Sequence, residues 1–140
     1  MMSDRPEGAI ELTIPGNLEY LDLVDNVVEA VNDLMHFGED EKTAVSISVV
    51  EAGTNAIQHG CPNGTRCEVH LCFMVAEDAL TITVRDQGKG FNPDRLPDPT
   101  SSENLLRERG RGIFIMRQMM DEVAFRFDRG TEVRLVKRRR

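Results

Sequence analysis

Residues 51–60 read Glu-Ala-Gly-Thr-Asn-Ala-Ile-Gln-His-Gly, and the interpretation of this stretch decides the fold. On a helix, Glu51 and Asn55 are neighbours on one face, with His59 one further turn along. An amide oxygen can complete the oxygen shell of Mg²⁺ without adding charge, and a nearby carboxylate can accept a proton. A solvated helix face has the same spacing and is commoner, so the spacing alone leaves both interpretations open.

The segment that contains this stretch carries two conflicting patterns. Residues 45–49 alternate with a period of two and are rich in β-branched side chains, which is typical of a strand. In contrast, no Gly or Pro interrupts residues 39–52, Asp40 among acidic neighbours suits a helix start, and Gly60 suits a helix stop. We therefore predict a helix over residues 39–60.

A second candidate site follows an apolar, alternating run that ends at Val84. Asp86 comes directly after this expected strand, and Gly88 and Gly90 follow it. An ionised carboxylate only accepts hydrogen bonds, so Asp86 would select a ring with an amino group, as in adenine, over one with a carbonyl, as in guanine. The glycines let the backbone approach a ligand closely. A tight turn capped by Asp is the alternative.

A third candidate site is the run Arg109-Gly110-Arg111-Gly112, which we expect to open a short helix over residues 113–121. Free amide groups at a helix start can bind an anion, and the arginines would add positive charge. A flexible hinge before a helix is the commoner explanation of such a run. Gly130 and Thr131, between two expected strands, add little by themselves.

The remaining patterns predict strands, one further helix and one long loop. Leu18, Leu21, Val24, Val28, Val31 and Met35 recur at helical spacing, with Asn17 as the cap and Gly38 as the end. Alternating residues predict strands at 10–14, 67–75, 80–84, 123–127 and 133–135. Residues 86–111 contain several Gly and Pro and little periodicity, which indicates a working loop. The predicted fold class is α+β: a two-layer α/β sandwich with three helices on one face of a mixed, mostly antiparallel sheet.

Length and charge limit the classes of function. At 140 residues the chain is expected to form one domain over 1–140. The net charge of −7 disfavours direct binding to nucleic acid, although residues 1–60 carry −10 and residues 61–140 carry +3. Four basic residues at 137–140 are expected to be a solvated terminus. Neither a membrane-spanning segment nor a secretory signal is visible, so we expect a cytoplasmic protein without a membrane partner.

The three cysteines, Cys61, Cys67 and Cys72, are odd in number and follow no metal-binding spacing. We expect reduced thiols. A zinc site that includes His59 is the weaker alternative, because zinc ligand pairs normally lie two to four residues apart.

In this order and at these separations, the candidate stretches resemble the four sequence boxes of the histidine-kinase-like ATPase superfamily. Within it, residues 51–60 and 112–123 are particularly similar to the bacterial anti-sigma factor serine kinases of partner-switching systems. The likeness covers about residues 8–137 and also favours a helix for the ambiguous segment.

The resemblance implies ATP and Mg²⁺ as cofactors. It implies that Glu51 is the general base, that Asn55 ligates Mg²⁺, that Asp86 binds the adenine amino group with support from Thr131, and that residues 91–111 are a lid. The implied nucleotide-binding residues are Asn55, His59, Asp86, Gly88, Gly90, Arg109, Gly110, Gly112 and Thr131.

The implied function is that of a serine kinase that phosphorylates an anti-anti-sigma (STAS) partner and sequesters a sigma factor, with homodimerisation implied by likeness alone. One alternative is a regulatory module that binds nucleotide to shape a docking surface, without phosphotransfer. The catalytic domain of a sensor histidine kinase is a weaker alternative, since the chain has no room for the helix pair that carries a phospho-accepting histidine.

Overall fold

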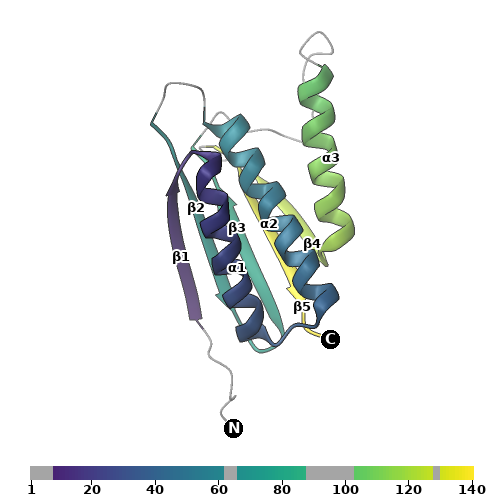
Figure 1. Cartoon of the computed structure of the whole chain (residues 1–140). Helices are drawn as coiled ribbons and strands as arrows, with labels where there is room; N and C mark the ends of the chain where they lie inside the picture. The colour runs from purple at the N-terminus through teal and green to yellow at the C-terminus, as the bar shows by residue number, and fades with distance from the viewer. Residues whose placement is uncertain (1–7, 62–65, 88–102, 128–129) are drawn as a thin grey trace.

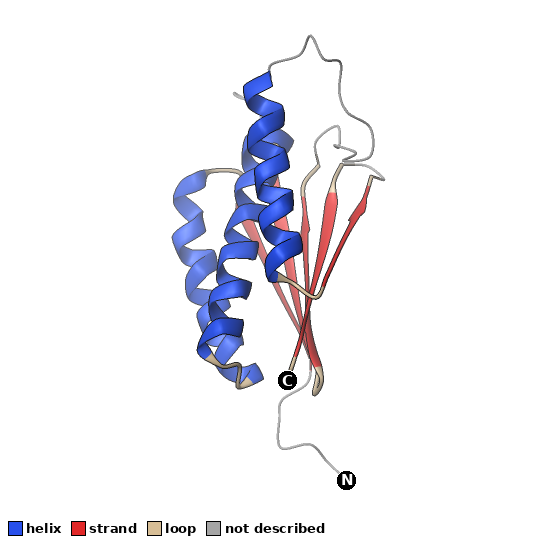
Figure 2. Cartoon of the chain, turned by 90° about the vertical axis from the view of Figure 1, so that its right-hand side faces the viewer, coloured by secondary structure: helices blue, strands red, loops and turns tan. Residues whose placement is uncertain are grey.

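A computed structural model describes residues 8–61, 66–87, 103–127 and 130–140, and for residues 103–109 the backbone alone. The chain forms two layers, with the helices on one face of a single sheet (Figures 1 and 2). The predicted α+β sandwich with three helices on one face is confirmed.

Five strands form one antiparallel sheet. Their order across the sheet is β1-β2-β3-β5-β4, with β3 at the centre. Every neighbouring pair of these strands is antiparallel. The bounds are β1 Gly8–Pro15, the 3-10 turn η1 Leu18–Tyr20, α1 Leu21–Met35, α2 Glu39–Gly60, β2 Glu68–Val75, β3 Ala79–Arg85, α3 Glu103–Met119, β4 Glu122–Arg126 and β5 Glu132–Arg138.

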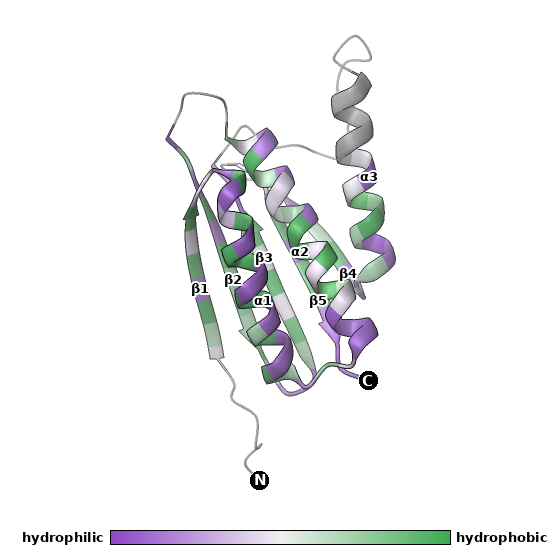
Figure 3. Cartoon of the chain, viewed as in Figure 1, coloured by the Kyte–Doolittle hydropathy of each residue, from purple (hydrophilic) through white to green (hydrophobic). Residues whose placement is uncertain are grey.

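The core lies between the sheet and the helices. Alternation along β2 and β3 sends every second side chain into this space, where Leu71, Phe73, Leu80 and Ile82 are buried. Met74 points to the uncovered face of the sheet and is exposed. Figure 3 shows hydrophobic and hydrophilic residues alternating along α1, as expected for a helix with one buried face.

Helix α2 resolves the ambiguous segment in favour of the predicted helix. Val45, Val49, Ala52 and Ala56 recur at helical spacing and are buried. The β-branched residues of this segment therefore belong to a helix whose apolar face packs on the core, and packing overrides their local preference for a strand. The predicted stop at Gly60 is confirmed.

The junction between α1 and α2 differs from the prediction in one detail. The chain leaves α1 at His36, which adopts a left-handed conformation with φ 56°, and not at Gly38. Gly38 instead precedes α2, where its amide donates to the Glu41 carboxylate at 3.0 Å. Asn17 accepts from the Glu19 amide at 3.0 Å and caps η1, not the long helix as predicted, because α1 begins only at Leu21. Leu18 is exposed and lies outside the apolar face of α1.

Residues 138–140 of the basic C-terminal segment are exposed, as predicted for a solvated terminus, and they are also tied to the turn between α3 and β4. The Arg138 amide donates to the Asp121 carboxylate and its guanidinium donates to Glu122, both at 2.6 Å. Arg140 also pairs with Asp121. Burial alone would raise the pKa of Asp121, but these hydrogen bonds hold the pKa below its ordinary value.

Two adjacent residues of β2 test this arrangement. Phe73→Ala should lower the free energy of unfolding by about 3–5 kcal/mol, because it leaves a large cavity in the core. Met74→Ala, at a position that is 53% exposed, should change it by less than about 0.5 kcal/mol. Urea unfolding followed by circular dichroism measures both, and equal effects would contradict the register of β2.

Candidate functional site

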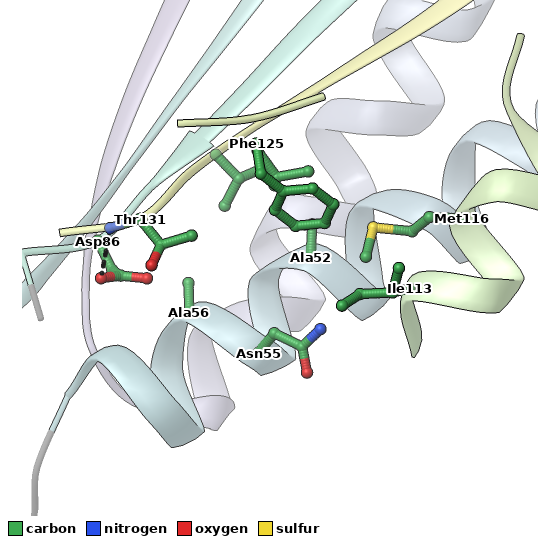
Figure 4. A pocket seen from close by; sticks show the side chains of 10 residues that line it. Ala52, Asn55, Ala56, Asp86, Ile113, Met116, Phe125 and Thr131 are labelled. Carbon is green, nitrogen blue, oxygen red and sulfur yellow. Dashed lines mark hydrogen bonds between the residues drawn. The ribbon is translucent and has the colours of Figure 1, made fainter. Parts of the chain in front are cut away.

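A small cavity of about 30 Å³ lies between α2, α3 and the ends of the central strands (Figure 4). Its wall is mostly apolar, with three polar side chains among the lining residues. The residues that line it are Ala52, Asn55, Ala56, Val84, Asp86, Ile113, Met116, Phe125, Thr131 and Val133. An apolar hollow with a few convergent polar groups is typical of a small-molecule site.

Asp86 is the buried charge of this cavity. It follows the last residue of β3, and its side chain is only 5% exposed. The Thr131 amide donates to Asp86 Oδ1 at 3.3 Å (Figure 4), and the Asp86 amide donates to the Thr131 carbonyl at 3.0 Å. Because a carboxylate out of water needs hydrogen-bond donors, the pairing of Asp86 with Thr131 fixes where the acceptor oxygens lie.

Glu51 and Asn55 lie side by side on α2, as their spacing predicted, and both approach Gly112 of α3. A Cβ atom placed on Gly112 would lie 2.9 Å from Glu51 Oε2 and 3.2 Å from Asn55 Nδ2. Gly112 thus lets α3 come close to these two polar side chains. Figure 4 shows the Asn55 amide at the rim of the cavity, on the same helix as Ala52 and Ala56.

His59 lies one turn beyond Asn55 on α2 and is half-buried. Its Nε2 atom is enclosed and has no hydrogen-bond partner among the residues that the structure describes. A buried ring nitrogen without a partner is costly unless a ligand or water satisfies it.

The structure corrects the expected anion cradle at Gly110 and Gly112. Helix α3 begins at Glu103, so both glycines lie inside the helix and their amides are not at its start. Residues 103–111 are rich in Leu, Arg and Glu, which favour helices, and a single Gly costs only about 1 kcal/mol in a helix interior. Arg111 is exposed, as is Gly110, and the backbone of Arg109 is helical.

The predicted loop over residues 86–111 is therefore shorter than expected, because its last part belongs to α3. Gly88, Gly90 and the first part of the expected lid lie outside the described residues.

Sequence reasoning missed the apolar wall of the cavity. Phe125 and Met116 come from β4 and α3, and nothing local marks them as site residues. Ala52 and Ala56 did carry a signal: two small side chains four residues apart share the face of α2 that is next to Asn55, which leaves room for a ligand between helix and sheet.

The cysteines differ from the expectation of three reduced thiols. Cys61 and Cys67 form a disulfide, and Cys72 is free. Cys61 directly follows α2 and Cys67 directly precedes β2, and the fold brings these two residues together. The spacing of the cysteines along the chain does not show this. Within the part of the chain that the structure describes, no group of three or more His, Cys, Asp or Glu side chains could hold a metal ion, so the zinc alternative gains no support.

Comparisons with known proteins bear on this geometry. Residues 14–137 match the histidine kinase-like ATPase domain family. Serine-protein kinase RsbW of Bacillus velezensis is 34% identical over 134 residues, covering 91% of this chain and 84% of the relative. The chain belongs to the histidine kinase-like ATPase family and, within it, to the RsbW serine-protein kinases. RsbW of Bacillus subtilis is 32% identical over the same shares of both chains.

A solved structure supports the fold assignment of this RsbW-family chain. The histidine kinase domain of the blue-light activated histidine kinase of Erythrobacter litoralis EL346 superposes with a TM-score of 0.52 at 21% identity, over 89% of this chain and 61% of that one. At this identity the likeness concerns the fold alone. No helix among the described residues is long and apolar enough to cross a membrane.

The disulfide predicts the labelling of the thiols. Iodoacetamide added to the denatured, unreduced RsbW-family protein should modify one cysteine, Cys72, and after reduction all three. In the folded protein, burial raises the pKa of the Cys72 thiol and the charge of Glu11 raises it further. Fewer thiolates at a given pH make its alkylation slower than in the unfolded chain. Peptide mass spectrometry gives the count, and three labels without reduction would contradict the disulfide.

Proposed function

We propose that this protein is an ATP-dependent protein serine kinase and anti-sigma factor. It transfers the γ-phosphate of ATP to a serine of an anti-anti-sigma protein of the STAS class, and it sequesters a sigma factor when that partner is not engaged. The name of its relatives supports the kinase activity. The observation that carries the proposal is the cavity, which places the buried carboxylate of Asp86 a short way from Asn55.

Asp86 is proposed to accept a hydrogen bond from the amino group of adenine. Its Oδ1 already accepts from the Thr131 amide, which holds the carboxylate in the wall of the cavity. The apolar wall, which includes Ala56 and Phe125, suits the faces of a purine ring. Guanine presents a carbonyl at the position of this amino group, so it would face the carboxylate with a second acceptor and bind less well.

The phosphates are proposed to extend past Asn55 and His59 of α2. Asn55 offers an oxygen at the rim of the cavity, and Mg²⁺ sites commonly use one or two protein oxygens with waters and phosphates. When bound, Mg²⁺ would neutralise the charge that develops on the transferred phosphoryl group. His59, one turn beyond Asn55 on α2, is a proposed contact for a nucleotide oxygen. Gly88, Gly90 and Arg109 remain proposed contributors to phosphate binding. Gly110 and Gly112, inside α3, are proposed only to shape the pocket by their lack of side chains.

Glu51 is proposed as the general base. Its carboxylate lies beside Asn55, where both approach Gly112. It would take the proton of the partner's serine hydroxyl while that oxygen attacks the γ-phosphorus and ADP leaves. Phosphoryl transfer depends mainly on positioning and charge, so one correctly placed carboxylate and one metal-binding amide account for much of the chemistry.

The proposed setting is the cytoplasm, without direct contact to nucleic acid or membrane, and the protein is proposed to act as a homodimer. Disulfides are rare in that compartment and are usually redox-active there. The alkylation experiment therefore also bears on where and in which redox state the protein works.

Removing the charge of the adenine-binding side chain should weaken nucleotide binding itself. Asp86→Asn is expected to cost about 1.5–3 kcal/mol of ATP binding, the value of a hydrogen bond to a charged group. Asp78→Asn, in the exposed turn at the opposite end of β3, is the matched control and should leave the affinity unchanged. Isothermal titration calorimetry with Mg²⁺ present measures both, and an unchanged Kd for Asp86→Asn would contradict the assigned role.

Removing the general base should affect transfer and spare binding. Glu51→Ala is expected to lower the rate of phosphate transfer to a STAS-class partner by roughly 10²–10⁴, with ATP affinity kept within about twofold. Asp40→Ala, an exposed carboxylate in the first turn of the same helix, is the control. Transfer from labelled ATP is followed by autoradiography.

The same assay separates the kinase from the alternative of a regulatory binding module. Wild-type transfer to a serine supports the kinase, whereas nucleotide-dependent complex formation without any transfer supports the module. A Glu51→Ala variant that transfers at the wild-type rate would contradict the role of Glu51.

A further inference from the structure

Gly60, the last residue of α2, lies in direct contact with Asp86. A Cβ atom on Gly60 would lie 2.3 Å from Asp86 Cγ, 2.5 Å from its Cβ and 2.6 Å from Oδ1. Carbon atoms in favourable contact are about 3.5–4.0 Å apart. No side chain of any size therefore fits at position 60 while the Asp86 carboxylate stays where it is.

The backbone of Gly60 does not itself require glycine. The glycines with positive φ among the described residues are Gly8 and Gly130, so Gly60 adopts a conformation that any residue can adopt. Glycine is also less favourable than alanine within a helix. What excludes a side chain at this position is the contact with Asp86.

Asp86 cannot easily move away from a side chain at position 60, because Gly130 and Thr131 hold its backbone in place. Gly130 has φ 106°, and a Cβ there would lie 2.1 Å from the Asp86 carbonyl oxygen. The next residue, Thr131, exchanges hydrogen bonds with the Asp86 amide and with Oδ1. Rotation of the Asp86 side chain would not relieve a substituent at Gly60 either, since the Asp86 Cβ is itself within 2.5 Å.

We propose that Gly60 is a positioning residue that sets the place of the Asp86 carboxylate in the cavity, and thereby the affinity and base selectivity of nucleotide binding. This inference rests on the proposed role of Asp86 toward adenine. A substituent at Gly60 forces the last turn of α2 and Asp86 apart, and a displaced carboxylate loses the distance and angle that its hydrogen bond to the ligand needs. Gly60 acts through Asp86 and needs no contact with the ligand.

The experiment compares two identical substitutions on one helix. Gly60→Ala should weaken ATP binding at least about tenfold and lower the preference for ATP over GTP, both measured by calorimetry with Mg²⁺. Gly53→Ala is the matched control: its Cβ would lie 2.9 Å from Leu21 Cδ2, the flexible end of a side chain that can move aside. Its ATP affinity and ATP preference should stay within about twofold of wild type.

A second readout needs no nucleotide. Gly60→Ala should lower the melting temperature of the wild-type protein, but not that of an Asp86→Gly variant, where the Cβ that it meets is gone. This pair of measurements stays decisive even where Gly60→Ala alone folds poorly, because the double variant should then recover the fold.

The outcomes separate the two proposals. If the wild-type protein binds ATP and the Gly60→Ala variant binds it with the same affinity and the same preference over GTP, the positioning role is overturned and the proposed function stands. Equal loss of melting temperature with and without the Asp86 side chain would also overturn it. A wild-type protein that binds no nucleotide would overturn the proposed function and this inference together.

Discussion

The buried carboxylate of Asp86 is the constraint on which the site depends. Folding removes this charge from water at the end of the central strand, and such a group is unfavourable unless donors or a ligand satisfy it. Thr131, the residue before β5, supplies backbone hydrogen-bond partners, and Gly60 at the end of α2 contacts the carboxylate without a side chain. The sheet and the longest helix thus meet around one acceptor, which is held in place before any ligand arrives.

Helix α2 connects the two halves of the site. Its buried face, with Val45 and Val49, packs on the core, and the polar positions Glu51 and Asn55 face Gly112 of α3. The same helix therefore positions the residues proposed for chemistry and, through its last residue, the residue proposed for base recognition. This division explains why loss of Glu51 and loss of Asp86 are expected to have different consequences.

Much of the fold was predictable because strand alternation and helical spacing agree with burial along most of the chain. Residues 45–49 were ambiguous, since β-branched residues on a buried helix face mimic a strand. The start of α3 was missed because Gly110 and Gly112 suggest a break that helix-favouring neighbours override. The Cys61–Cys67 bond depends on how α2 and β2 lie relative to each other, and the spacing of the cysteines along the chain does not predict this arrangement. Likewise, the sequence around Gly60 predicts the end of a helix but does not indicate a contact with Asp86.

The most direct test removes from the nucleotide the amino group of adenine, which Asp86 is proposed to recognise. Calorimetric titration of the wild-type protein, with Mg²⁺ present, would compare ATP with the triphosphate of purine riboside, which lacks the amino group. ATP is expected to bind at least about tenfold more tightly, as a hydrogen bond to a buried charge requires. Equal affinities for the two nucleotides would contradict it.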